Sequence, residues 1–208
     1  MTAAHCVNIF TRNAHAISVQ VGRKTISKLV DPSVYVAEEI IPHPEYSAQN
    51  DWINDIAVIK LRQPLVFSQT VQPVSLPPVC YEVSGPDKTV TVLGWGVTEH
   101  GRLADILQKL NYSFVPFPDC FQQLRRSIYR TQICAARPNY NKAECDGDSG
   151  GPLMYHGMQI GIVSWSVKPC AVAQYPGVFT QVSYYIKFLY TYTDLEPADV
   201  EFRPCGVK

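Results

Sequence analysis

The chain has 208 residues with 18 basic and 18 acidic side chains, so its formal net charge is zero and no nucleic-acid partner is expected. Hydrophobic residues make up 46% of it, which is enough for a substantial core, while 16 prolines and 12 glycines favour many turns. No apolar stretch approaches the roughly 20 residues that a membrane-spanning helix needs, so we expect no membrane span.

Short strands separated by turns dominate the predicted elements. Runs of β-branched or aromatic residues between Gly, Pro, Asp or Asn predict strands at 34–36, 56–61, 90–93, 109–115, 159–165 and 178–182. The proline-containing stretch 76–86 predicts an extended linker between two halves, because proline removes a backbone donor. Apolar residues at helical spacing predict one C-terminal helix over 183–195. The pattern therefore indicates an all-β protein with a single substantial helix.

Residues 145–153, Cys-Asp-Gly-Asp-Ser-Gly-Gly-Pro-Leu, are the most informative segment of the chain. Ser149 lies between Gly147 and Gly150, where the backbone can turn sharply and direct several amide hydrogens at one point. Acyl transfer needs such donors for the negative charge of its tetrahedral intermediate. An ordinary acidic, glycine-rich turn is the alternative, but it leaves the order of these residues unexplained. We therefore predict that Ser149 is a nucleophile.

A serine nucleophile needs a base and a carboxylate that orients the base. His5 lies among small residues in Thr-Ala-Ala-His-Cys, and Asp55 begins the apolar run Asp-Ile-Ala-Val-Ile-Lys-Leu. Taken singly, such a histidine is more often structural and such an aspartate is more often a turn residue. Together with Ser149 they form a plausible catalytic set.

Three motifs, TAAHC at 2–6, DIAVIKL at 55–61 and GDSGGPL at 147–153, resemble those of the trypsin and chymotrypsin family of serine endopeptidases. The order His, Asp, Ser separates that family from subtilisins and from α/β-hydrolases. The agreement runs from the first residues to about residue 195. It implies a general base at His5, an orienting carboxylate at Asp55, and an oxyanion hole made by the backbone amides of Gly147 and Ser149.

The resemblance also implies a fold of two antiparallel six-stranded barrels with the catalytic residues between them. Residues 1–208 would form a single peptidase domain, truncated at its N-terminus because the chain begins at the histidine motif. Residues 1–79 would be the remnant of the first barrel. Residues 80–195 would hold the linker, the second barrel and the C-terminal helix, and 196–208 would form an irregular tail.

Asp148 connects this truncation with activity. In the family, the amino terminus made by activation cleavage forms a buried ion pair with the acid before the nucleophile. A buried charge left without its partner is costly. We therefore expect Asp148 to turn away or become protonated, and the isolated chain to be inactive or zymogen-like.

The seven cysteines indicate an oxidising compartment, and hence a secreted, extracellular protein. The resemblance implies disulfides between Cys120 and Cys134 and between Cys145 and Cys170. Cys80 stands where some relatives carry a bridge to the C-terminal helix, but Ser183 occupies the partner position, so Cys205 is the substitute partner. Cys6 is left free or paired outside these residues.

The resemblance places the base of the substrate pocket at the neutral residue Ala143, which favours apolar side chains before the scissile bond. Gly177 would form one wall, and the opposite wall and the strand that binds the substrate backbone would come from Ser164, Trp165 and Ser166. Glu144 could point into the cavity and Asp146 stands at its mouth, so either acid could attract a basic side chain. The preference stays open, with apolar or mixed side chains favoured.

The function expected from these features is hydrolysis of peptide bonds through an acyl-enzyme intermediate. The alternative is a non-catalytic homologue that acts as a binding module, which the intact residues His5, Asp55 and Ser149 disfavour. Expected partners are protein or peptide substrates, an activating protease and protein inhibitors, and we expect a monomer. Metal-ligand spacing is absent, so we expect no cofactor and no catalytic metal. Whether the glycosylation pattern at Asn111 is used stays open.

Overall fold

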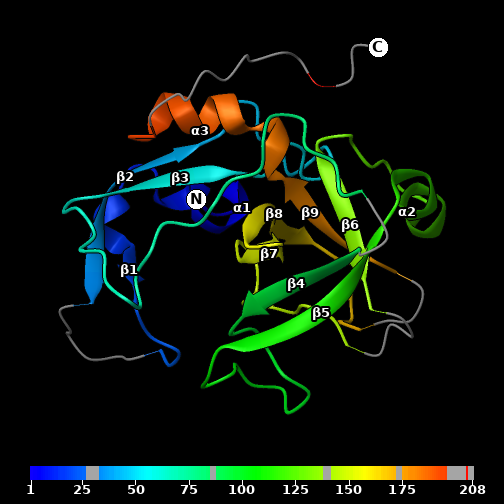
Figure 1. Ribbon diagram of the computed structural model, residues 1–208, viewed down its shortest axis with the longest axis horizontal. Coiled ribbons are helices and arrows are strands. Elements are labelled where there is room, and N and C mark those ends of the chain that lie inside the picture. The colour runs from blue at the N-terminus through cyan, green and yellow to red at the C-terminus, as the bar shows by residue number, and fades with distance from the viewer. Residues whose placement is uncertain (27–32, 85–87, 138–141, 172–174, 196–204, 206–208) are drawn as a thin grey trace.

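The computed structural model describes residues 1–26, 33–84, 88–137, 142–171, 175–195 and 205. An antiparallel sheet of three strands and a closed barrel of six strands lie side by side (Figure 1). The sheet contains β1 (Ser18–Gln20), β2 (Val34–Pro42) and β3 (Ala57–Leu61), in that order. The barrel has the order β4 (Thr89–Gly94), β5 (Gln108–Val115), β6 (Gln132–Ala136), β9 (Gly177–Gln181), β8 (Met158–Trp165) and β7 (Pro152–Tyr155). The all-β prediction is confirmed.

Two barrel strands have no counterpart among the predicted ones. β6 reads Gln-Ile-Cys-Ala-Ala and β7 reads Pro-Leu-Met-Tyr, so neither contains the run of β-branched residues by which the other strands were predicted. Both are held by pairing on two sides, β6 between β5 and β9 and β7 between β4 and β8. Closure of the barrel, rather than local propensity, makes them strands.

The barrel interior is filled by side chains that alternate along the strands. In β5, Tyr112 is buried, and Leu110 and Phe114, two residues away on either side, pack on the same cluster. Residues from five other strands complete this cluster, namely Val90, Val92, Ile133, Ala135, Leu153, Tyr155, Ile160, Val163 and Phe179. A tyrosine within such a core requires a polar partner for its hydroxyl.

Short helices surround these sheets: α1 (Ala4–Val7), α2 (Phe117–Leu124) and α3 (Ile186–Tyr192). The predicted helix over 183–195 is wrong at both ends. Val182–Tyr184 forms a 3₁₀ turn before α3, and Thr193 has extended backbone angles. The sequence did not predict α2, although Pro118 and Asp119 lie in its first turn, where both residue types favour a helix start.

A second core joins the sheet to the barrel. α3 lies along the top of the molecule in Figure 1, above β3 and β8. Its buried residues Ile186 and Leu189 share a cluster with Ile56 and Val58 from the sheet side and Ile162 from β8. Ala3, next to α1, belongs to the same cluster. This core therefore fixes the segment of His5 and the segment of Asp55 relative to the barrel.

Three disulfides link Cys80 to Cys205, Cys120 to Cys134 and Cys145 to Cys170. The last two are the pairs that the resemblance implies, and the first is the substitute pairing expected for Cys80. Cys6 has a free thiol and is partly buried. The described residues 76–84 of the predicted linker form neither helix nor strand, and Cys80 N donates to the backbone oxygen of Ser183. The predicted linker residues 85 and 86 lie outside the described residues, as does most of the predicted irregular tail.

Candidate active site

Backbone pairing brings the His5 segment to the Asp55 segment. Thr2 and Ala57 exchange two hydrogen bonds, of 2.9 Å from Thr2 N to Ala57 O and 2.8 Å from Ala57 N to Thr2 O. α1 begins two residues after Thr2, and Asp55 lies two residues before Ala57. One antiparallel bridge therefore sets the approach of His5 to Asp55.

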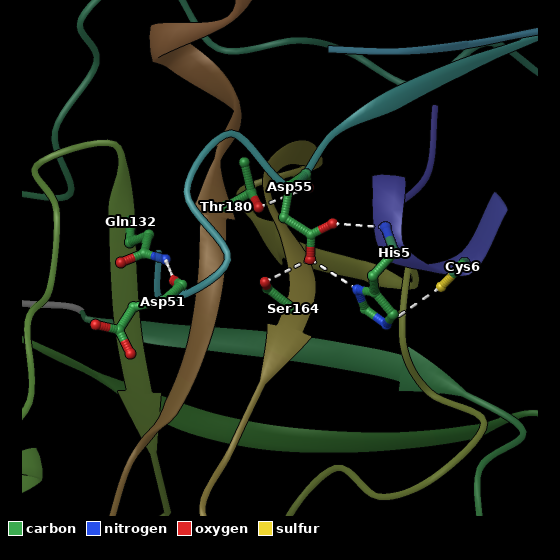
Figure 2. A network of polar contacts seen from close by, with 7 residues as sticks. All are labelled: His5, Cys6, Asp51, Asp55, Gln132, Ser164 and Thr180. Atoms are coloured by element: carbon green, nitrogen blue, oxygen red, sulfur yellow. Dashed lines mark hydrogen bonds and ion pairs between the residues drawn. The ribbon is translucent and has the colours of Figure 1, made fainter. Parts of the chain in front are cut away.

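Asp55 is fully buried, and hydrogen bonds hold its carboxylate from both sides (Figure 2). Oδ1 accepts the backbone N–H of His5 at 2.9 Å, while Oδ2 lies 2.7 Å from His5 Nδ1 and accepts the hydroxyl of Ser164 at 2.6 Å. Thr180 Oγ1 donates to the Asp55 backbone oxygen at 2.8 Å. A carboxylate so fixed can hold an imidazole in one orientation and stabilise its charged form.

The other ring nitrogen of His5 faces a sulfur atom. Nε2 lies 3.5 Å from Cys6 Sγ, as the dashed line in Figure 2 shows. Burial by itself lowers the pKa of His5, but the hydrogen bonds and charges of Asp55 and Cys6 outweigh it and raise the pKa to about 10. No hydrogen bond joins His5 to Ser149 in the described part of the chain.

The nucleophile segment is a tight turn in which two backbone amides are free. Gly147 and Gly150 have positive φ angles of 94° and 79°, a region that L-residues avoid. Asp148 N donates to Cys145 O and Gly150 N donates to Val163 O, each at 2.9 Å. The amides of Gly147 and Ser149 have no acceptor among the described residues, and Ser149 is exposed. Both amides are thus available to an oxyanion.

The turn packs directly against the His5 segment. A β-carbon placed on Gly150 would stand 2.2 Å from Thr2 Oγ1 and 3.4 Å from Cys6 Sγ. Ser149 and His5 are the chain neighbours of Gly150 and Cys6, so the candidate nucleophile and base come from segments in contact. The three motifs therefore meet in one place.

Asp148 does not turn away from the turn, so the first of its two expected outcomes is wrong. Its Oδ1 accepts the N–H of Gly96 at 2.7 Å, and its Oδ2 accepts the N–H of Cys145 at 2.9 Å. Two backbone amides therefore bind both carboxylate oxygens and keep the side chain directed inward. Charge-assisted bonds of this kind are among the strongest that a carboxylate makes.

The residues predicted for the substrate pocket divide into two groups. Ala143 and Gly177 line one small hollow together with Tyr112, and Glu144 is buried beside Gly177, 5% exposed. Asp146, in contrast, is an exposed residue that forms an ion pair with Lys168 at 2.6 Å.

The strand segment predicted to bind the substrate backbone also makes contacts within the protein. Ser164 is buried with its hydroxyl on Asp55, and Ser166 is half-buried. Trp165 is buried and stacks on Trp52, with 5.8 Å between ring centroids, while the Arg126 guanidinium lies 5.1 Å from the Trp165 ring. The contacts of Ser164, Trp52 and Arg126 were not predicted, since each joins residues more than 35 positions apart in sequence.

Other functional features are absent from the described residues. No cluster of three or more His, Cys, Asp or Glu side chains among them could hold a metal ion. Each helix in the described ranges falls short of the length and hydrophobicity needed to span a bilayer.

Comparison with known proteins places the chain in a family. Residues 1–189 match the family model described as Trypsin. The chain belongs to the trypsin family. Three relatives in the trypsin family are similar to it over 91% of its length. Kallikrein-11 of Mus musculus is 33% identical over 196 positions, covering 68% of that protein.

Two further relatives come from other animals. Kallikrein-15 of Saguinus oedipus is 34% identical over 202 positions and is covered to 75%, and chymotrypsin-2 of Vespa crabro is 36% identical over 190 positions and is covered to 82%. As a trypsin-family member, the chain is a serine endopeptidase by family, and the alternative of a binding module is not favoured.

Proposed function

We propose that His5, Asp55 and Ser149 form the catalytic triad with which this protein hydrolyses peptide bonds. Ser149 Oγ attacks the scissile carbonyl carbon while its proton passes to His5 Nε2, and the amides of Gly147 and Ser149 stabilise the oxyanion. The intermediate expels the amine, which takes the proton from His5. Water then repeats the attack on the acyl-enzyme and releases the acid.

The observation that carries this proposal is the environment of Asp55. A fully buried carboxylate with three donors, one of them the imidazole of His5, lies next to a turn that leaves two amides free. A structural histidine would not need this arrangement beside an exposed serine.

Nε2 lies 3.5 Å from Cys6 Sγ and has no described hydrogen bond to Ser149. The imidazole and the hydroxyl must therefore come within hydrogen-bond distance before the first proton transfer. This supports the proposal that the 208-residue chain reacts slowly and is zymogen-like.

The proposal extends to the extracellular location of the protein and to its partners. Three disulfides support an extracellular location, because such bonds persist in oxidising compartments. The substrates are proteins or peptides, with an activating protease and protein inhibitors as further partners of a monomeric peptidase domain.

A fluorophosphonate probe tests the triad. We expect it to label Ser149, identified by mass spectrometry of the labelled peptide, and to leave Ser149→Ala and His5→Ala unlabelled. The matched control is His100→Ala, whose imidazole is 71% exposed and outside the site. A folded wild-type chain that stays unlabelled at long reaction times would contradict the proposal and favour a binding module.

A further inference from the structure

The backbone that leads to Asp55 is strained. Asp51, Trp52 and Asn54 have positive φ angles of 46°, 52° and 58°, in the left-handed region. Aspartate and asparagine tolerate this region, whereas a bulky side chain such as that of Trp52 seldom adopts it. A strained segment keeps its conformation only when its surroundings hold it there. The groups that hold residues 51–54 therefore also help to place Asp55, the next residue in the chain.

The groups that hold the beginning of this segment come from one part of the barrel. The Cys120–Cys134 disulfide joins α2 to β6 and closes a loop of residues 120–134, here called the closed loop. Arg126 Nη2 donates to Asp51 Oδ1 at 2.7 Å, Gln132 Nε2 donates to the Asp51 backbone oxygen at 2.9 Å, and Tyr129 Oη donates to Asn50 Oδ1. Figure 2 shows the Gln132 contact in the same view as the hydrogen bonds of Asp55.

Arg126 supplies the charge among these three donors. Its ion pair with Asp51 is partly shielded from water, since the two side chains are 48% and 22% exposed. The guanidinium also lies 5.1 Å from the Trp165 ring, which stacks on Trp52. Charge-assisted hydrogen bonds are stronger than neutral ones, so Arg126 makes the strongest of the three contacts. It therefore restrains Asp51 directly and the strained Trp52 through Trp165.

Other side chains fix the far end of the segment. Tyr185 Oη donates to Asn54 Oδ1 at 2.9 Å, and Thr180 Oγ1 donates to the Asp55 backbone oxygen at 2.8 Å. Neither contact involves the closed loop, so both remain when a side chain of that loop is changed. Loss of the Arg126 guanidinium should therefore loosen the beginning of the segment and displace the carboxylate of Asp55 without unfolding the chain.

We propose that Arg126 is a positioning residue for catalysis: by holding Asp51, it keeps the carboxylate of Asp55 directed at the imidazole. Its described contacts are with Asp51 and Trp165, so it acts through them rather than on the reacting atoms. This inference rests on the proposed function, since it concerns the same triad. Small misplacements of catalytic groups cost large factors in rate, so the effect should be measurable.

Arg126→Gln tests this inference, with Arg125→Gln as the matched control. Arg125 is the adjacent arginine and is exposed, and its side chain forms no hydrogen bond or ion pair within the described ranges. We expect labelling of Ser149 by the fluorophosphonate probe to slow by about tenfold in Arg126→Gln and to keep the wild-type rate in Arg125→Gln.

NMR titration of His5 separates positioning from general structural support. Burial lowers the pKa of His5, but the hydrogen bond with Asp55 is the largest of the effects that raise it, so a displaced carboxylate should lower this pKa. We expect the lower pKa in Arg126→Gln and the wild-type value in Arg125→Gln. Slower labelling with an unchanged titration would overturn the inference, because Arg126 would then act on the approach of the probe.

A double variant tests whether Arg126 acts through Asp51. Asp51→Asn removes the charge but not the conformation, since asparagine also tolerates positive φ. If both groups act through one contact, Asp51→Asn combined with Arg126→Gln should label no more slowly than the slower single variant. Rate losses that multiply in the double variant would overturn the inference. Asp51→Asn also carries the test if Arg126→Gln does not fold.

Failure of this inference can be distinguished from failure of the triad. A folded Arg126→Gln protein with the wild-type labelling rate and titration would overturn the inference and leave the triad intact. If the wild-type chain is not labelled, the titration of His5 still decides, because it does not require a reactive Ser149. A lower pKa in Arg126→Gln alone then supports the positioning role, and equal values in all proteins overturn it.

Discussion

Gly150 and Thr2 approach so closely that a β-carbon on the glycine would stand 2.2 Å from the threonine hydroxyl oxygen. Contact between the nucleophile turn and the histidine segment therefore depends on a missing side chain. Any larger residue at this glycine must displace the Thr2 side chain or push the two segments apart.

Gly150→Ala should separate these segments. Gly157 supplies the control, because it has the same φ of 79° but no atom within 4 Å of the place where its β-carbon would stand. Both variants bear the cost of an L-residue at positive φ, roughly 1 kcal/mol or more. Only Gly150→Ala adds a clash, of about 1 to 3 kcal/mol. Urea unfolding should show that difference, and probe labelling should be lost in Gly150→Ala alone. Equal behaviour of the two variants would show that the contact is unimportant.

Ser164→Ala removes one of three donors to the Asp55 carboxylate. The remaining buried oxygen is less well satisfied, which costs about 1 to 3 kcal/mol. We expect lower stability and slower labelling of Ser149, because the imidazole loses part of its support. The exposed Ser127→Ala is the control. Full labelling rate in a destabilised Ser164→Ala protein would limit Ser164 to a structural role.

Cys6→Ala should lower the pKa of His5, because the sulfur is one of the two groups that raise it. A general base must be neutral, so labelling should begin at lower pH in the variant. NMR titration of the imidazole, assigned with His5→Gln, measures the same change directly. An unchanged titration would mean that Asp55 alone sets the basicity of His5.

The raised pKa of His5 also makes stability depend on pH. The pKa of His5 is about 10 in the folded chain and 6.5 in the unfolded chain, so its contribution to stability is complete below about pH 6.5. That contribution is lost as pH rises through 10. Urea unfolding across this range should therefore show a loss of stability in the wild-type chain that is absent from His5→Gln. The same loss in both proteins would assign it to other groups.

Glu144 should also make the folded chain less stable as pH rises, but over a lower pH range than His5. Burial raises its pKa from 4.5 to about 7, so the folded state holds its proton more tightly than the unfolded state. Stability therefore falls as pH rises between these values, by about 3 kcal/mol for a shift of this size. Urea unfolding at both ends of the range should show that Glu144→Gln removes this loss, whereas Glu99→Gln retains it.

Contiguous motifs made much of the fold and site predictable. His5, Asp55 and Ser149 each lie in a segment of five to nine characteristic residues, and the structure brings those segments together. Strands rich in β-branched residues, such as β4 and β8, were predicted for local reasons. β6 was not, since its pairing partners alone make it a strand.

Pairwise contacts at the site were harder to predict. Tyr112 and Glu144 are 32 residues apart, and no local pattern connects them. A tyrosine hydroxyl inside a barrel core needs a polar partner, but that rule does not say which residue supplies it. The inward position of Asp148 was mispredicted because family reasoning supplied an ammonium partner and overlooked the amides of Gly96 and Cys145.

The Cys80–Cys205 disulfide spans 125 residues and encloses both other disulfides. A protease that cuts any loop between these two cysteines therefore leaves the pieces covalently joined. Such a nicked molecule would migrate as one band until a reductant is added, so intact mass on a non-reducing gel says nothing about whether the barrel has been cleaved.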